Sequence, residues 1–164
     1  VDEMSLRAKG RWPWRRDKLA RLTETIHQAG AMVLGFDIIF TEEDDNPAEQ
    51  VLGKLHLIEN APAIVKEAIS GLIPHFKSDD AFVKALSGGE NVMGFYLNQE
   101  NMSPSGALPR NTLKINASIK DELIVPEARS YIGNMTLINQ VASTGGFTTT
   151  IRSQKAKYFV FWYL

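Results

Sequence analysis

The side chains best suited to binding a ligand lie in the first part of the chain and combine carboxylates, indoles and a guanidinium. They are Asp2, Glu3, Trp12, Trp14, Arg16 and Asp37. Indole faces attract apolar or cationic groups, and a guanidinium binds a carboxylate or a phosphate. In parallel α/β sheets, ligands gather beyond the carboxyl ends of the strands. We therefore predict a polar ligand-binding cleft, floored by the two aspartates and walled by the tryptophans and the arginine.

The same residues also have a purely structural interpretation. Asp37 stands inside an apolar run, and a buried carboxylate needs a partner such as the Arg16 guanidinium or a nearby backbone N–H group. The tryptophans would then close the hydrophobic core instead of holding a ligand. The sequence leaves both interpretations open.

Evidence for catalysis is weak. Aspartates expected near strand ends, Asp2, Asp37 and Asp79, are able in principle to hold a hard cation such as Mg²⁺. The histidines are too scattered to form a ligand set, and no G-x-S-x-G elbow, P-loop or H-E-x-x-H motif is present. The chain has no cysteine, which excludes disulfides and thiolate metal sites. We predict no catalytic residue, metal site or cofactor, and a metal-dependent hydrolase is the least favoured alternative.

Hydrophobic patterning predicts which elements position these residues. Residues 1–3 are expected to end a first strand. Apolar residues recur at helical spacing over residues 16–29, and Gly30 is a suitable helix stop. Residues 31–40, AMVLGFDIIF, form a nearly continuous apolar run. This pattern is typical of a central strand covered on both faces, so Asp37 is expected within the sheet.

The rest of the chain continues this alternation. Residues 42–45 are acidic and are expected to form a solvated loop, because they lack the spacing of a calcium-binding loop. Asn46 and Pro47 then suit the cap and first residue of a helix that extends to about residue 60. We further expect helices at 61–76, 78–86 and 136–142, strands at 91–97, 147–152 and 157–164, and short elements at 113–117 and 123–125. The fold class is α/β, a layered sandwich with a largely parallel or mixed central sheet and helices on both faces.

Composition narrows the function classes. The 164 residues fit one domain, 1–164, with 44% hydrophobic and 23% charged residues and a net charge of −1. A net charge so close to zero does not indicate binding to nucleic acid or to an anionic membrane. No apolar run is long enough to span a bilayer. The chain opens at Val1 without an initiator Met, and we expect it to be a fragment of a longer protein.

Several motifs together resemble one family, the type-two CHASE domain (cyclase/histidine-kinase-associated sensing extracellular). The opening D-E-x-S-L is followed by G-R-W-P-W-x-R, at residues 2–6 and 10–16. Residues 35–40, GFDIIF, resemble a characteristic strand of that family. Residues 78–86 and 91–94 are similar to its SD-x-x-F-x-x-AL helix and NVVLG strand. The segment between Asp45 and Ser78 is longer than is usual in the family.

The resemblance implies an extracytoplasmic sensor, periplasmic or extracellular, of a bacterial membrane receptor. Membrane helices outside this fragment would connect it to a cytoplasmic adenylate cyclase, histidine kinase or serine/threonine kinase, so the domain itself is not expected to be an enzyme. The expected partner is an unknown small-molecule or envelope ligand, and a homodimer is one possible assembly. The alternative is a ligand-free dimerisation or protein-interaction scaffold.

Overall fold

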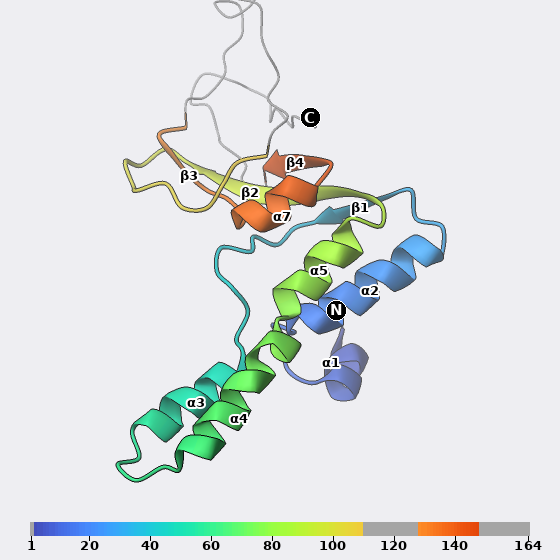
Figure 1. Cartoon of the computed structure of the whole chain (residues 1–164). Helices are drawn as coiled ribbons and strands as arrows, with labels where there is room; N and C mark the ends of the chain where they lie inside the picture. The colour runs from blue at the N-terminus through green and yellow to red at the C-terminus, as the bar shows by residue number, and fades with distance from the viewer. Residues whose placement is uncertain (1, 110–127, 148–164) are drawn as a thin grey trace, which may run out of the picture.

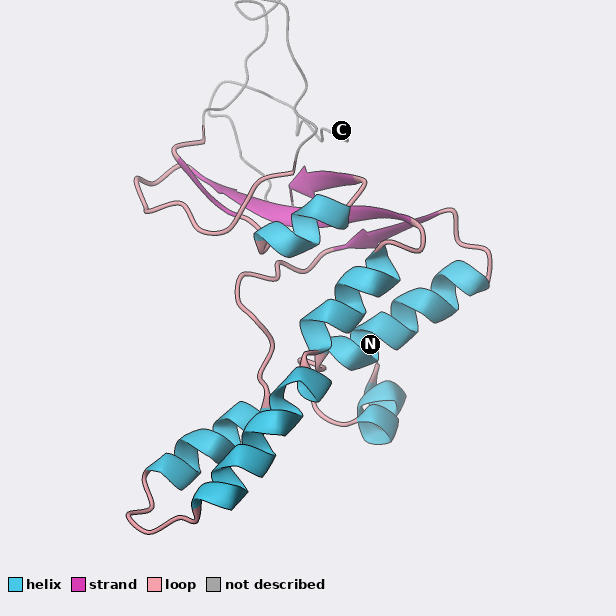
Figure 2. Ribbon diagram, viewed as in Figure 1, coloured by secondary structure: helices cyan, strands magenta, loops and turns pink. Residues whose placement is uncertain are grey.

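A computed structural model describes residues 2–109 and 128–147 (Figures 1 and 2). Its helices are α1 (Glu3–Lys9), α2 (Arg16–Gln28), α3 (Pro47–His56), α4 (Ala63–Leu72), α5 (Ser78–Leu86) and α7 (Thr136–Val141), with a 3-10 turn η1 (Ile73–Phe76). Its strands are β1 (Val33–Phe36), β2 (Glu90–Asn98), β3 (Ser130–Ile132) and β4 (Thr144–Phe147). A helix directly precedes each of the strands β1, β2 and β4, which pair in parallel, as expected for the α/β class.

Strand β2 organises the sheet. It pairs in parallel with β1 (Gly35 opposite Val92) and with β4 (Met93 opposite Gly145), and its far end pairs antiparallel with β3. The predicted mixed sheet in an α/β fold is therefore confirmed. Helices were expected on both faces, but in the described residues α2, α5 and α7 lie on one face only (Figure 1). The chain returns from β1 to the parallel strand β2 through four helical segments, so this connection is a long crossover.

The core lies between this helical layer and the sheet. Phe82, Leu86, Met93 and Ile138 are fully buried, and they come from α5, β2 and α7. Phe82 contacts the Phe40 ring edge-on at a centroid distance of 5.0 Å and the Phe36 ring at 5.7 Å. These aromatic contacts connect α5 to the chain that leaves β1, which fixes the direction of that chain.

Helices α3 and α4 form an antiparallel hairpin that projects from the rest of the molecule (Figures 1 and 2). We call residues 46–76 the arm. Asn46 caps α3 by accepting a hydrogen bond from Ala48 N at 3.0 Å, and Pro47 occupies the first helical position, as predicted. The Asn46 amide also donates to Ile73 O at 3.0 Å, which joins the two ends of the arm. The arm packs on itself far more than on the core.

Two of the predicted strands differ in the structure. The expected strand end at residues 1–3 is wrong, because Asp2 caps helix α1 instead. The strand expected at residues 31–40 is confirmed only over Val33–Phe36, and in the part of the chain that the structure describes it pairs with β2 alone. Its central position is therefore occupied by β2. Strand β1 itself has no buried residue, and Val33 is 57% exposed, whereas Phe40, beyond the strand, packs in the core.

The remaining predictions agree more closely. Helices were expected at 16–29, 78–86 and 136–142, and α2, α5 and α7 lie within a residue of these limits. The helix predicted at 61–76 is divided into α4 and η1, where Pro74 interrupts the regular hydrogen bonding. The predicted elements at 113–117, 123–125 and 157–164 lie outside the described residues, as does most of the strand at 147–152.

Replacing Phe82 with Ala is expected to lower the free energy of unfolding by roughly 3–5 kcal/mol, because it leaves a cavity among the buried aromatic rings. Chemical denaturation of the purified chain measures this loss. The control is Leu57→Ala on the arm, where the side chain is 86% exposed and a change within about 0.5 kcal/mol is expected. Equal effects of the two substitutions would contradict this assignment of the core.

Candidate functional site

The Arg16 side chain is the centre of the candidate site. It begins α2, is 8% exposed, and its guanidinium donates to Asp79 Oδ1 at 2.5 Å and to Glu42 O at 2.5 Å. The guanidinium carbon also lies 5.1 Å from the centroid of the Phe40 ring, within cation–π range. These contacts compensate the cost of burying the charge. The guanidinium therefore makes these hydrogen bonds within the chain. Its geometry does not support the prediction that it binds a carboxylate or phosphate of a ligand.

Asp44 forms a second centre beside Arg16. Its Oδ2 accepts hydrogen bonds from Arg16 N at 2.8 Å and from Ser78 Oγ at 2.5 Å, while its own backbone N–H donates to Asp79 Oδ2 at 2.8 Å. Arg16 and Ser78 are the first residues of α2 and α5. One carboxylate therefore serves two helix N-termini, where the helix dipoles favour negative charge. The prediction that residues 42–45 form a merely solvated loop is wrong for Asp44.

The two tryptophans lie close together in the loop before α2. Their rings meet edge-on with centroids 5.8 Å apart, and the Trp14 indole donates from Nε1 to Gly10 O at 2.9 Å. Trp14 packs against the hydrophobic core, whereas Trp12 is 42% exposed. The Trp12–Pro13 peptide bond is cis. One indole thus belongs to the core and the other is available at the surface.

A cavity of about 410 Å³ opens beside these residues. Its walls combine the loop before α2 with the segment that leaves β1, and they include Trp12, Trp14, Arg16, Ile38, Phe40 and Glu43. The structure therefore brings together three of the six residues predicted to bind a ligand. Residues 38–45 run back across the N-terminus of α2 and form the opposite wall. We call this space the indole cavity.

The other predicted site residues lie elsewhere. Asp2 accepts hydrogen bonds from Ser5 N at 2.8 Å and from Ser5 Oγ at 2.6 Å, and both bonds lower the pKa of its carboxyl group. Glu3 is exposed and lies 3.9 Å from Arg7 in a pair spaced four residues apart on α1. Neither side chain lines the indole cavity, and Asp37 does not line it either, so the predicted floor of Asp2 and Asp37 is not found there.

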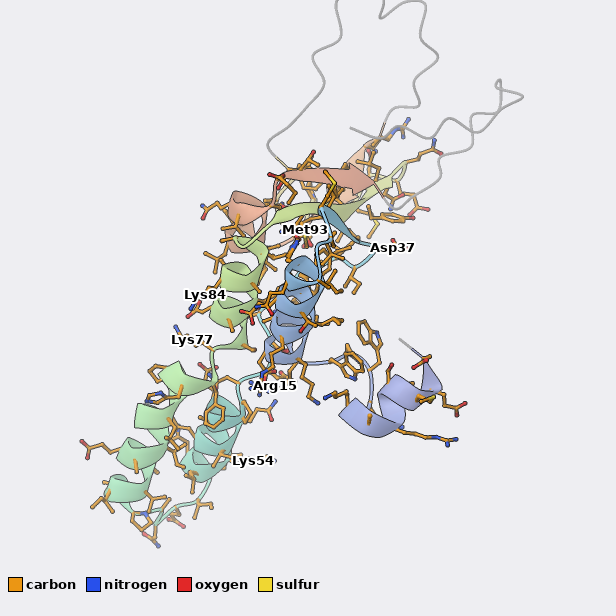
Figure 3. The ribbon with its side chains drawn as sticks, turned by 90° about the vertical axis from the view of Figure 1, so that its right-hand side faces the viewer. Arg15, Asp37, Lys54, Lys77, Lys84 and Met93 are labelled. Atoms are coloured by element: carbon orange, nitrogen blue, oxygen red, sulfur yellow. The ribbon has the colours of Figure 1, made fainter. Side chains whose placement is uncertain are left out.

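Asp37 follows β1 and is exposed, near the sheet and away from the arm (Figure 3). The alternative prediction, a pair between Asp37 and Arg16, is wrong, because Arg16 pairs with Asp79. The sequence indicates Asp79 only as a metal-ligand candidate and does not predict its pairing with Arg16. No local pattern indicates a contact between residues so far apart in the chain.

The carboxylates once considered for a metal site do not converge. Asp2 caps α1, Asp37 is exposed after β1, and Asp79 pairs with Arg16. Within residues 2–109 and 128–147, no three carboxylate or histidine side chains are grouped so as to hold a metal ion. In the same residues, no helix has the length and apolar character needed to span a bilayer.

Comparison with models of protein families gives a match to most of the chain. The family model described as the CHASE2 domain matches residues 1–155, nearly the whole chain. No curated protein and no solved structure matches.

Replacing Arg16 with Ala is expected to destabilise the fold by roughly 3–5 kcal/mol, because Asp79 keeps its partly buried charge without its cationic partner. Chemical denaturation measures the loss. Arg7→Ala is the matched control, since its pair with Glu3 is exposed and should contribute less than about 1 kcal/mol. An Arg16→Ala variant as stable as the parent chain would show that the guanidinium does not hold the fold together.

The Asp2 cap makes a separate prediction about pH. Its pKa lies below the ordinary value of 3.8, so the cap stabilises α1 fully above that value and is lost as the pH falls through the lower folded pKa. Ser5→Ala removes the largest cause of the lowering and should raise the pKa of Asp2 toward its ordinary value. Carboxyl titration by NMR measures this. The backbone cap bond from Ser5 N remains in this variant, so an unchanged pKa would show that the Ser5 hydroxyl does not bond to the Asp2 carboxylate.

Proposed function

Because the chain belongs to the CHASE2 family, whose members are sensory extracellular domains of signalling receptors, we propose that it senses a small ligand at the indole cavity. The observation that carries this proposal is the juxtaposition of an exposed indole, an apolar wall and a half-open space large enough for a small molecule. Ligand pockets commonly have volumes of about 300–1,000 Å³ and are lined by aromatic and apolar side chains with a few polar groups.

The charges around the cavity favour a cationic ligand. Glu42, Glu43 and Asp45 are exposed along its rim. The two cations of its lining each have a carboxylate partner, Asp17 for Arg15 and Asp79 for Arg16. The Trp12 ring offers a face for cation–π contact, which is strongest with tryptophan. An organic cation with an apolar body matches both features, because its charge would face the rim carboxylates and its body the wall. An anionic ligand would meet repulsion at the rim.

The receptor context forms the rest of the proposal. Membrane helices outside these residues would place the domain on the extracytoplasmic side, periplasmic or extracellular, and connect it to a cytoplasmic cyclase or kinase. Ligand binding shifts a conformational or dimeric equilibrium only if the two states differ in affinity. Residues 38–45 line the cavity and lead directly into the arm, which makes the arm a suitable element to respond.

A second candidate function is a dimerisation or protein-interaction scaffold without a small ligand. The arm favours this alternative, because it carries apolar side chains that are exposed in the single chain, including Leu57 at 86% and Ile64 at 75%. Apolar surface of this kind commonly marks an interaction site. The two functions are compatible if ligand binding controls the use of the arm.

Choline and its uncharged analogue dimethylbutanol provide a matched pair of probes. Choline is expected to raise the thermal midpoint of the chain and to change its tryptophan fluorescence, while dimethylbutanol has a much weaker effect. Trp12→Ala should abolish the choline response with little change in stability, because Trp12 is exposed and contacts Trp14 at its edge.

Two controls make the result specific. Leu57→Ala on the arm should keep the choline response, because Leu57 does not line the cavity. Equal responses to both probes would show that the site does not select for positive charge. No response to any quaternary ammonium compound, with the chain folded, would count against a cation sensor and in favour of the scaffold.

A further inference from the structure

The outer side of α4 is apolar although nothing among the described residues covers it. Ile64 is 75% exposed, Val65 40% and Leu72 44%, and α4 has no buried residue at all. These residues and Ala68 recur at spacings of three and four, which places them along one side of the helix. Ile69 and Ile73, both half-buried, lie on the side that faces α3. Helix α4 therefore has a second apolar side, which faces away from α3.

Gly71 lies beside this apolar stripe and leaves room for the close approach of a second helix. It lies inside the regular helix Ala63–Leu72, where glycine is unfavourable compared with alanine. A side chain at this position would meet no other atom within 4 Å, and the backbone there does not have a positive φ. Neither packing nor backbone conformation in the single chain requires glycine. A partner backbone or side chain that packs against Gly71 would explain it.

We propose that α4 pairs antiparallel with α4 of a second copy of this chain, about a two-fold axis at Ala68. Such an axis sets Ile64 opposite Leu72 of the other copy and Val65 opposite Gly71. The large side chain thus meets the glycine, and the small Ala68 lies at the closest approach of the two helices. A two-fold interface must be self-complementary in this way. The apolar stripe and the glycine are then explained by one contact.

The charges agree with a second copy and disfavour an anionic lipid surface. The arm carries Glu49, Glu59 and Glu67 against Lys54 and Lys66. Two such arms have little net repulsion, whereas binding to anionic lipid needs a basic cluster.

The contact is small. Helix α4 has ten residues and hence a length of about 15 Å, so this interface falls below the area of about 800 Å² per partner that is usual for stable complexes. A weak dimer is therefore expected from this contact alone. Weak association suits a receptor domain, because attachment to one membrane raises the effective concentration. The inference does not rest on the indole cavity, and a dimer that ignores choline would refute only the proposed ligand.

Single cysteines test the geometry directly, since the chain has no cysteine of its own. Ala68→Cys is expected to form a disulfide-linked dimer under mild oxidation, because residue 68 meets its own copy. Ala81→Cys on α5 is the control, being equally exposed but off the arm, and it should stay monomeric. A mixture of the Ile64→Cys and Leu72→Cys chains should yield the mixed dimer in preference to either self-dimer.

Two outcomes of the cross-linking would overturn the proposal. If Ile64→Cys and Leu72→Cys each link to themselves more readily than to one another, the helices pack in parallel and the axis is wrong. If Ala68→Cys links no better than Ala81→Cys, no such pairing of α4 occurs, and the stripe is covered by another part of the chain or by a different partner.

Sedimentation equilibrium provides a second test in the absence of cross-links. Ala68→Glu should raise the dissociation constant of the dimer roughly tenfold or more, because two like charges then meet at the axis. Ala81→Glu should leave it unchanged. Gly71→Ala should raise the thermal midpoint of the chain and still weaken the dimer, whereas Gly53→Ala, in α3, should raise the midpoint alone. If Gly71→Ala and Ala68→Glu dimerise like the parent chain, the proposal is wrong.

Discussion

The buried charge of Arg16 is the constraint on which the rest of the structure depends. A guanidinium that is 8% exposed is tolerated only if carboxylate and carbonyl oxygens surround it, and here Asp79 and the Glu42 carbonyl supply them. These partners come from α5 and from the segment after β1, which are far from Arg16 in sequence. Satisfying one charge therefore fixes three parts of the chain relative to one another. It also orients the Phe40 ring, which lies beneath the guanidinium and belongs to the aromatic core.

The elements that local chemistry determines could be predicted from the sequence, and those that depend on distant contacts could not. Asn46 and Pro47 begin a helix by themselves, and Gly30 follows α2 with a positive φ that suits glycine. At residues 1–3 the carboxylates were interpreted as a strand end, although an aspartate followed three residues later by a serine also suits a helix cap. The apolar run at 31–40 indicated the burial of Phe40, but not the exposure of Met32 and Val33, which are 86% and 57% exposed. Phe40 is buried by α5 rather than by a neighbouring strand.

In the candidate site, too, the features set by local sequence could be predicted and those set by distant contacts could not. Trp12, Trp14 and Arg16 are near in sequence and share a loop and a helix start, so their grouping around one cavity was predictable. The acidic side of that cavity was assigned to Asp2 and Asp37, whereas the rim carboxylates belong to residues 42–45. Which acidic segment crosses the N-terminus of α2 depends on the path of the chain after β1. That path is set by the Arg16 and Asp44 contacts, which leave no trace in local spacing.

The same contacts connect the indole cavity to the arm through one segment, residues 38–45. Residues 38–45 form a wall of the cavity and end at Asn46, the cap of α3, while Arg15 at the junction donates to Asp45 O at 3.3 Å and to Phe76 O at 3.3 Å (Figure 3). Any ligand that moves this wall must strain those bonds or move the arm with it. Packed elements of this kind shift between discrete arrangements instead of deforming gradually. Coupling then requires only that the ligand bind more tightly to the arrangement in which α4 is free to pair.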